Sequence, residues 1–380
     1  MKIESYKTEK LKVEKDLNEM TKKSDLISWI RVALFILIMG LLSYGYFKKI
    51  NIFYAFVAVL TIIFFVIVKL HSDIELKIKY KKSKIQVYQK YIKRLNGTWY
   101  DFKEKGTEYL DENMPYLKDL DIFGEGSLYQ YICSANTIYG KKSLVKHLKQ
   151  NDYNLDYIIK HQEAVKELSN MQDFANEIET LSYLTKENKK KNINKEIKKF
   201  IEVCEDETPN QVKLNKILMI VLPAILIAVL ALCLIGINRA FYFNVLKVVI
   251  IINLLLAFLN MQKSTSILLP IGDFYKNIKV YENIFKEIDK QDFESSYLKE
   301  LKEGLNKDGG SLKAIKELKK IGSYIDLRQN FVANIILNAI VLWDFYCIDM
   351  FDKWKKSYGK NIRTYLEIVG EIEALISLAS

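Results

Sequence analysis

Cysteine and histidine are scarce in this chain of 380 residues. The four cysteines form no CxxC pair, so we expect reduced, buried thiols without a disulfide framework or a cysteine-based zinc site. The three histidines are too scattered along the sequence to predict a metal cluster. These residues are Cys133, Cys204, Cys233 and Cys347, with His71, His147 and His161.

Catalytic motifs are also missing from the sequence, which holds no HExxH, no Ser/His/Asp grouping and no carboxylate pair in a Gly-rich setting. The segment 135–142 comes nearest to a phosphate-binding loop. Such a loop needs glycine where Ala135 stands and Ser or Thr where Lys142 stands, and the Gly359-Lys360 pair lacks the upstream glycine as well. We therefore predict no catalytic, cofactor-binding or metal-binding residues and no cofactor. We expect that the chain is not an enzyme and does not itself hydrolyse ATP.

Apolar residues, by contrast, gather in four long stretches that form two pairs. The stretches are Leu26–Phe47, Ile50–Leu70, Ile217–Ile237 and Phe241–Leu259. Each has about the twenty residues that a helix needs to cross a bilayer. Within each pair only a few polar residues intervene, Lys48-Lys49 in one case and Asn238-Arg239 in the other. The sequence therefore predicts a multi-pass membrane protein with two transmembrane helical hairpins.

A hairpin returns the chain to the side from which it started, so segments 1–25, 71–216 and 260–380 should share one compartment. Lysines flank these ends of the stretches, and the positive-inside rule places them in the cytoplasm. We therefore expect four spans in the cell membrane with both termini cytoplasmic. The flanking lysines are Lys22, Lys23, Lys69, Lys77, Lys79, Lys81, Lys82, Lys84, Lys213, Lys216 and Lys263.

The formal net charge of +11 has two interpretations. The favoured one is positive-inside bias together with adhesion to anionic lipid. The other is contact with nucleic acid, for which the basic run Lys186–Lys199 is a candidate. Lys247, near the start of the fourth stretch, is expected to extend its amine to the membrane interface.

The remaining sequence is helical in pattern, so we predict a mostly all-α fold. Its five parts are an N-terminal cytosolic helix (1–25), hairpin 1 (26–70), a long helix with the first half of a core (71–216), hairpin 2 (217–259) and the second half of the core (260–380). Within the core we expect helices over 71–110, 127–149, 155–184, 271–289, 294–305, 311–321 and 358–379, and a short extended piece over Leu117–Phe123.

Residues 329–351 are nearly all apolar and could form a fifth span. They also hold several amides and carboxylates, including Asn334, Asn338 and Asp344, which are costly in lipid. We therefore favour a buried core helix in a soluble domain over a fifth span.

Two separated stretches of the core resemble the core, or lever, domain of MutS-type mismatch repair proteins. The first begins as Leu-Asp-Ile-Phe-Gly-Glu-Gly-Ser-Leu at 120–128, passes through Thr137, Gly140, Leu144 and Leu148, and ends with the helix 158–168. In the family a Gly-Ser-Leu strand-to-helix element leads to a Thr-x-x-Gly helix and then to a helix that opens with Arg-Gln. The second comprises Leu342-Trp343-Asp344, Trp354, Gly359 and the run Gly-Glu-Ile-Glu-Ala-Leu-Ile-Ser-Leu-Ala at 370–379. The likeness is greatest to the membrane-bound branch of MutS-like proteins and covers most of residues 100–380.

The chain departs from the family pattern in ways that bear on function. His161-Gln162 stands where the family has Arg-Gln, and the usual proline is absent near Lys149–Asn154. Hairpin 2 occupies the place of the DNA-contacting clamp. The mismatch-reading wedge, Phe-x-Glu in a Gly-rich context, is matched only in bare form by residues 102–104 and 285–287. The chain stops at Ser380, where the family's ATPase domain would begin.

The resemblance implies mismatch-repair-type DNA binding and ATP-dependent function, of which this chain has only the core. Our first hypothesis is a membrane-anchored MutS-like core, a lever or interaction module whose ATPase comes from a further domain or a second polypeptide. The alternative is a membrane scaffold whose basic face binds protein partners or anionic lipid. The expected partners are the lipid bilayer and an ATPase subunit or domain. A homodimer is left open, and any nucleic-acid binding is expected to be weak and nonspecific.

Overall fold

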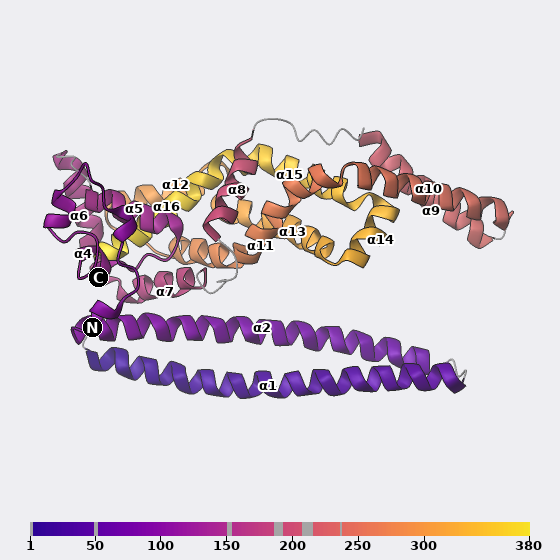
Figure 1. The fold of residues 1–380 in the computed structure, drawn as a ribbon, viewed down its shortest axis with the longest axis horizontal. Helices are drawn as coiled ribbons and strands as arrows, with labels where there is room; N and C mark the ends of the chain where they lie inside the picture. The colour runs from indigo at the N-terminus through magenta and orange to yellow at the C-terminus, as the bar shows by residue number, and fades with distance from the viewer. Residues whose placement is uncertain (1–2, 49–51, 150–153, 186–192, 207–215, 236–237) are drawn as a thin grey trace. The chain divides into compact units, whose positions relative to one another are not determined.

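The computed structural model describes residues 3–48, 52–149, 154–185, 193–206, 216–235 and 238–380 (Figure 1). It is 87% helical, and the described residues form no strand, which confirms the predicted all-α fold. The chain divides into two compact units, each treated by itself below. Unit 1 comprises Met1–Cys133 and Met171–Leu184, and unit 2 comprises Ser134–Asn170 and Thr185–Ser380.

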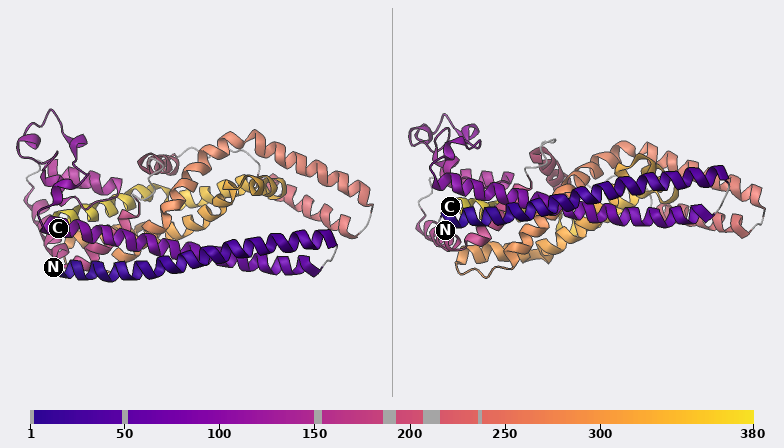
Figure 2. Two further views of the ribbon diagram at one scale, coloured as in Figure 1. Left: turned by 60° about the horizontal axis from the view of Figure 1, so that its bottom comes forward. Right: turned by 90° about the horizontal axis from the view of Figure 1, so that it is seen from below.

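Unit 1 is built on a long antiparallel helical hairpin, whose two helices lie side by side in both views of Figure 2. We expected separate helices over 1–25 and 71–110, but both are continuous with the apolar stretches. The second helix contains neither glycine nor proline, so nothing interrupts it before Asn96-Gly97. The elements of unit 1 are α1 (Ile3–Lys48), α2 (Ile52–Leu95), α3 (Tyr116–Asp119), α4 (Leu128–Ile132) and α7 (Gln172–Tyr183), with the 3-10 turns η1 (Trp99–Asp101) and η2 (Thr107–Tyr109).

The apolar halves of α1 and α2 are exposed over most of their surface. In the most apolar 18-residue segment of each helix, 0% of the residues of α1 and 6% of those of α2 are buried. Both helices are long and apolar enough to cross a membrane. Arg31, which the sequence analysis did not single out, lies inside the first apolar stretch. Its Nη1 is 3.0 Å from Nδ1 of His71 on the facing helix, and the hydroxyls of Ser24 and Ser28 each lie 3.1 Å from Nε2 of the same ring. This polar cluster fixes the register of the hairpin where its apolar half begins.

The polar half of the hairpin packs against α7. Tyr80 donates a hydrogen bond to Glu177, and Lys90 donates one of 2.8 Å to the buried carboxylate of Glu179. The predicted extended piece over Leu117–Phe123 is wrong, because the chain there forms α3 and a turn closed by a bond of 2.9 Å from Ile122 N to Leu117 O. The Gly-Ser-Leu element likewise has no strand, and the Ser127 side chain instead caps α4.

Unit 2 holds a bundle whose core is formed by α8, α11, α13, α15 and α16. The Phe200 ring of α8 stacks on Phe274 of α11 at 4.1 Å, and the indole of Trp354 on α15 donates to Ala314 O on α13. The elements are α5 (Ile138–Lys149), α6 (Leu155–Asn170), α8 (Ile193–Glu205), α9 (Lys216–Ile235), α10 (Arg239–Leu259), α11 (Met261–Asp289), α12 (Ser296–Asn306), α13 (Ser311–Asp326), α14 (Phe331–Val341), α15 (Trp343–Tyr358) and α16 (Ile362–Leu378), with η3 (Lys307–Gly309), η4 (Leu327–Gln329) and η5 (Gly359–Asn361).

The single helices predicted over 127–149 and 155–184 are each divided in two. The first gives α4 and α5, because residues 133–137 leave the helix to surround a buried carboxylate described below. The second gives α6 and α7, which meet at Met171 and belong to different compact units. Residues 150–153, where the family proline was sought, and 186–192 of the basic run lie outside the described residues.

The second apolar pair forms helices α9 and α10, which pack along each other and run side by side in Figures 1 and 2. Helix α10 is long and apolar enough to cross a membrane, whereas the apolar part described for α9, Ile217–Cys233, is shorter. Pro223 lies inside α9 without ending it. The amine of Lys247 lies 4.6 Å from the centre of the Phe243 ring on the preceding turn of α10.

Residues 329–351 form two helices rather than one buried helix. Leu342 adopts a left-handed conformation with φ 53°, and the chain bends there by 83°. The expectation of a core helix is correct for α15, which buries Phe345, Ile348 and Phe351, but wrong for α14, whose apolar side chains are exposed. Helix α14 packs beside α9 and α10, and with the segment that follows it forms a fourth candidate span.

Candidate functional site

Helices α5 and α16 of unit 2 pack against each other with close backbone contact. A Cβ added to Gly370 would lie 2.5 Å from the carbonyl carbon of Tyr139 and 2.8 Å from the amide nitrogen of Gly140. Real Cβ atoms do not come so near to backbone, so only glycine allows the two helices to touch here. This contact brings the N-terminal end of α5 against the middle of α16.

The carboxylate of Glu373 lies in this junction and is almost fully buried, with 2% of the residue exposed. It accepts hydrogen bonds from the backbone amides of Asn136 at 2.9 Å and Thr137 at 3.3 Å, and a further one from the Thr137 hydroxyl. The same hydroxyl accepts from the amide of Gly140 at 2.9 Å and so caps α5. A buried charge is thus held at the positive end of a helix, where free N–H groups stabilise an anion.

This junction also accounts for the segment that comes nearest to a phosphate-binding loop. Residues 135–142 do lead into the N-terminus of a helix, as such a loop does, but the anion held there is the chain's own Glu373. Ser377, one turn further along α16, closes the junction by hydrogen-bonding the amide and hydroxyl of Ser134.

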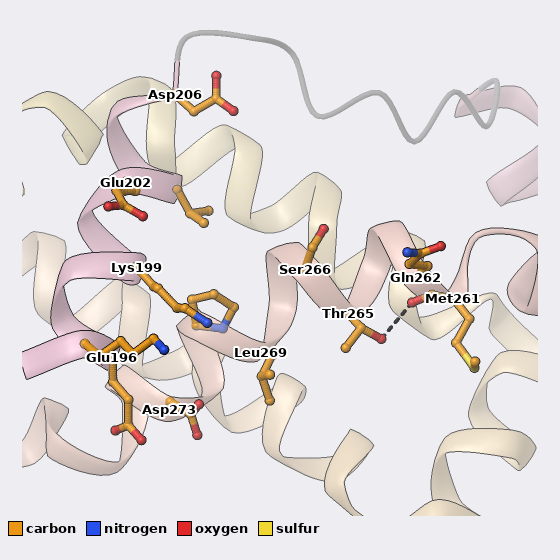
Figure 3. A pocket seen from close by; sticks show the side chains of 13 residues that line it. Glu196, Lys199, Glu202, Asp206, Met261, Gln262, Thr265, Ser266, Leu269 and Asp273 are labelled. Atoms are coloured by element: carbon orange, nitrogen blue, oxygen red, sulfur yellow. Dashed lines mark hydrogen bonds between the residues drawn. The ribbon is translucent and has the colours of Figure 1, made fainter. Parts of the chain in front are cut away.

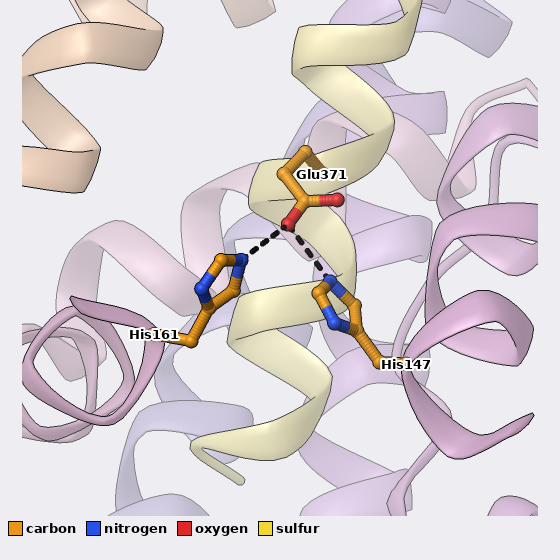
Figure 4. Close-up of side chains that lie close together, drawn as sticks. All are labelled: His147, His161 and Glu371. Carbon is orange, nitrogen blue, oxygen red and sulfur yellow. Dashed lines mark hydrogen bonds and ion pairs between the residues drawn. The ribbon is translucent and has the colours of Figure 1, made fainter. Parts of the chain in front are cut away.

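A second carboxylate of α16, that of Glu371, gathers side chains from three other helices of unit 2. Figure 4 shows the two histidines beside it. Its Oε1 lies 2.8 Å from Nε2 of His147 on α5, 3.6 Å from Nε2 of His161 on α6, and accepts a bond of 3.0 Å from the Tyr297 hydroxyl on α12. Its Oε2 accepts from the hydroxyl of Ser143 on α5. The side chains of both histidines and of Glu371 are 15% exposed or less.

The charge states in this cluster follow from its contacts. Burial alone would raise the pKa of Glu371, but the hydrogen bonds from His147, Ser143 and Tyr297 outweigh it and lower the pKa to about 2. Burial lowers the pKa of His161, although its bond to the Tyr157 carbonyl opposes that shift. The cluster therefore combines an ionised carboxylate with a neutral imidazole near pH 7.

From their spacing the three histidines were expected to form no metal cluster, and no site residues were predicted. The structure brings two of them, His147 and His161, within reach of Glu371. Separations of 14 and 210 residues along the chain carry no recognisable spacing signal, because the three helices meet only through tertiary packing. His71 belongs to the hairpin of unit 1.

A further hollow of about 1030 Å³ lies between α8 and the first half of α11 (Figure 3). Its charged lining includes Lys195 and Lys199, but these are outnumbered by Glu196, Glu202, Asp206 and Asp273. The described part of the basic run is therefore interleaved with carboxylates. This hollow does not provide the uniformly basic surface that attracts nucleic-acid phosphates.

No family model, curated protein or solved structure matches this chain.

The α5–α16 junction predicts an unequal response to the same substitution at two glycines. Gly370→Ala forces a methyl group into backbone that cannot move aside, so we expect a loss of at least about 2 kcal/mol in the free energy of unfolding. Gly40→Ala in α1 is the matched control, since its added Cβ would meet nothing within 4 Å and alanine favours helix by up to about 1 kcal/mol. Thermal unfolding of the detergent-solubilised chain measures both. Equal melting temperatures for Gly370→Ala and the unaltered protein would contradict the described contact.

Proposed function

We propose that this chain is the membrane-anchored core of a MutS-like protein, acting as a lever or interaction module for an ATPase supplied by a further domain or a second polypeptide. One observation carries the proposal. Parts of the two separated stretches that resemble the family, residues 134–168 of the first and 370–379 of the second, belong to unit 2, where α5 and α6 pack against α16. Thr137 and Gly140 of the first meet Gly370 and Glu373 of the second, although about 230 residues and hairpin 2 lie between them.

Membrane anchoring rests on the exposure of the apolar helices. Among the described residues, three helices are long and apolar enough to cross a membrane, and a fourth candidate is the bent pair that begins with α14. Side chains such as Phe241 and Phe258 on α10 are 57% and 70% exposed, which is unfavourable in water and natural in lipid. Within this proposal, both hairpins span the bilayer and the lysine-rich ends place both termini in the cytoplasm.

Helix α14 enlarges the lipid-facing surface beside hairpin 2. Phe331 and Val332 are 76% and 62% exposed, and the amide of Asn253 on α10 donates to Ala339 O of α14 at 2.8 Å. The polar side chains at the C-terminal end of α14, which weighed against a fifth span, form hydrogen bonds within unit 2. Asp344 accepts two bonds of 3.1 and 3.0 Å from Arg328, and its amide donates to Asn338. Because these groups do not require water, α14 can enter lipid as a shallow re-entrant helix.

Nucleic-acid binding is a minor part of the proposal, because much of the basic surface of α2 is already neutralised. Lys81, Lys84 and Lys90 are paired with Asp16, Glu177 and Glu179 within unit 1. A lysine held by a carboxylate releases fewer counterions when it meets a phosphate. We therefore expect weak, salt-sensitive DNA binding without preference for a mismatch.

The second candidate function, a scaffold whose basic face holds anionic lipid, is favoured by a different observation. Lys77, Lys79 and Lys82 are exposed on α2 within a few turns of its apolar half. Lysines near the end of a span interact with anionic headgroups. The same three residues would also provide whatever DNA binding the unit has, so anionic lipid and DNA should compete for them.

The ATPase partner can be sought by photo-crosslinking in intact cells. A photoreactive residue is placed at exposed Lys299 or Lys316 of unit 2, and the adducts are identified by mass spectrometry. We expect the dominant adduct to carry a phosphate-binding loop, and we expect Gly370→Ala to abolish it while membrane insertion is retained. Adducts formed only with a second copy of this chain, or only with proteins that bind no nucleotide, would contradict the MutS-like proposal and favour the scaffold.

DNA binding is measured by salt titration of the detergent-solubilised chain against matched and mismatched duplexes, with anionic vesicles as competitor. We expect affinity to fall steeply with salt, no mismatch preference, and displacement of DNA by the vesicles. The triple change Lys77→Gln, Lys79→Gln, Lys82→Gln should weaken DNA binding at least tenfold. The control triple Lys313→Gln, Lys316→Gln, Lys320→Gln on α13 removes equal charge from exposed positions and should have a smaller effect. A mismatch preference that persists at high salt would refute this part of the proposal.

A further inference from the structure

The side chains of His147, His161 and Glu371 meet at one point of unit 2 from three different helices. Each offers one ligand atom, and the three atoms lie within 4.8 Å of one another (Figure 4). We propose that these three residues form a binding site for a divalent transition-metal ion, of which zinc is the best match. Two imidazole nitrogens and one carboxylate oxygen are a ligand set that zinc accepts readily. The site goes beyond the proposed function, which does not require a metal.

His161 provides the main argument. Its Nδ1 lies 2.7 Å from the carbonyl oxygen of Tyr157, so Nδ1 carries the proton and Nε2 presents a lone pair. That Nε2 is buried, and it has no hydrogen-bond partner among the described residues. A buried acceptor without a hydrogen-bond partner costs free energy, and a bound ion is one way in which proteins remove that cost.

Nε2 of His161 faces a second acceptor atom, Oε1 of Glu371, at a distance of 3.6 Å. Two lone pairs facing each other repel unless a cation or a proton lies between them. The His161 side chain is only 11% exposed, and burial disfavours a protonated ring. A metal ion bound to both atoms would satisfy the nitrogen and the carboxylate together.

His147 is placed to complete the set. Its Nε2 lies 2.8 Å from Glu371 Oε1, and its Nδ1 lies 3.3 Å from the hydroxyl of Tyr157. A metal bound at Nε2 would displace the proton that this nitrogen donates to Glu371, and a proton on Nδ1 would then be donated to the Tyr157 hydroxyl. Metal-bound histidines commonly make such a second bond, which fixes the ring and its tautomer.

Glu371 is oriented by groups that are not themselves ligands. Ser143 donates to Oε2 and Tyr297 donates to Oε1 at 3.0 Å, so the carboxylate is ionised and held in place before a metal arrives. Supporting hydrogen bonds of this kind are typical around metal-binding carboxylates. An ion at this point would join α5, α6 and α16, and would thus fasten the first family-like stretch to the second.

The test uses the full chain, purified in detergent without a polyhistidine tag. Cobalt(II) serves as the spectroscopic probe and zinc as the stabilising ion. We expect one equivalent of cobalt to give visible d–d absorption without a sulfur charge-transfer band, and zinc to raise the melting temperature by several degrees, reversibly with chelator. His147→Ala and His161→Ala should abolish both signals, and Glu371→Gln should weaken binding at least tenfold.

The third histidine provides the control. His71→Ala lies in unit 1 and should leave cobalt binding unchanged. Tyr157→Phe retains all three ligands and removes only the hydroxyl beside His147, so its affinity for cobalt should fall only several-fold. This variant tests the site in a folded protein even if the histidine variants unfold. Absence of cobalt absorption in the unaltered protein, or equal binding by His161→Ala, would overturn the proposal and leave a purely hydrogen-bonded cluster. Loss of binding in His71→Ala alone would assign the metal to the hairpin and overturn it as well.

Discussion

The buried carboxylate of Glu373 is the interaction on which the organisation of unit 2 depends. Burying an isolated charge is costly, and here the cost is offset by two backbone amides and a hydroxyl at the N-terminus of α5. Because those donors come from residues 136–137 and the carboxylate from residue 373, this group joins the two ends of the unit at the centre of a junction that Gly370, Glu371 and Ser377 extend. An apolar hairpin can therefore be inserted between them without dividing the core.

Both compact units combine an apolar helical pair with a polar helical part. In unit 1 the two parts belong to the same helices, since α1 and α2 run from exposed apolar surface into a region of ion pairs and stacked tyrosines such as Tyr6 and Tyr91. In unit 2 they are separate helices, and α14 lies against hairpin 2 while α15 enters the core. The boundary between exposed apolar surface and polar surface is marked in each unit by a polar cluster, which is partly buried around His71 in one unit and buried around Asp344 in the other.

Much of this architecture could be predicted from sequence because it follows from local pattern. Long apolar stretches identify the hairpins, and helical periodicity identifies α12 and α16 to within a few residues. It places the other core helices without their bounds, since α11 and α13 are longer than predicted and the helices over 127–149 and 155–184 are each divided. The bend at Leu342 was not predicted, because nothing in the sequence indicates that this leucine adopts a left-handed backbone conformation. The side chain is fully buried, so tertiary packing holds the residue in that conformation. The cluster around Glu371 was missed because its members approach only through tertiary contacts. The sequence did identify the residues of the α5–α16 junction, but as parts of a family resemblance and not as neighbours.

The central claim, that one buried carboxylate closes the core across hairpin 2, is tested most directly by hydrogen exchange on Glu373→Gln. This change keeps the shape of the side chain and removes the charge that the α5 terminus holds. We predict that amides in 134–149 and 362–378 lose protection together, by at least tenfold, while those of α2 in unit 1 are unchanged. Faster exchange confined to α16, with α5 still protected, would show that the two segments are held together by something other than Glu373.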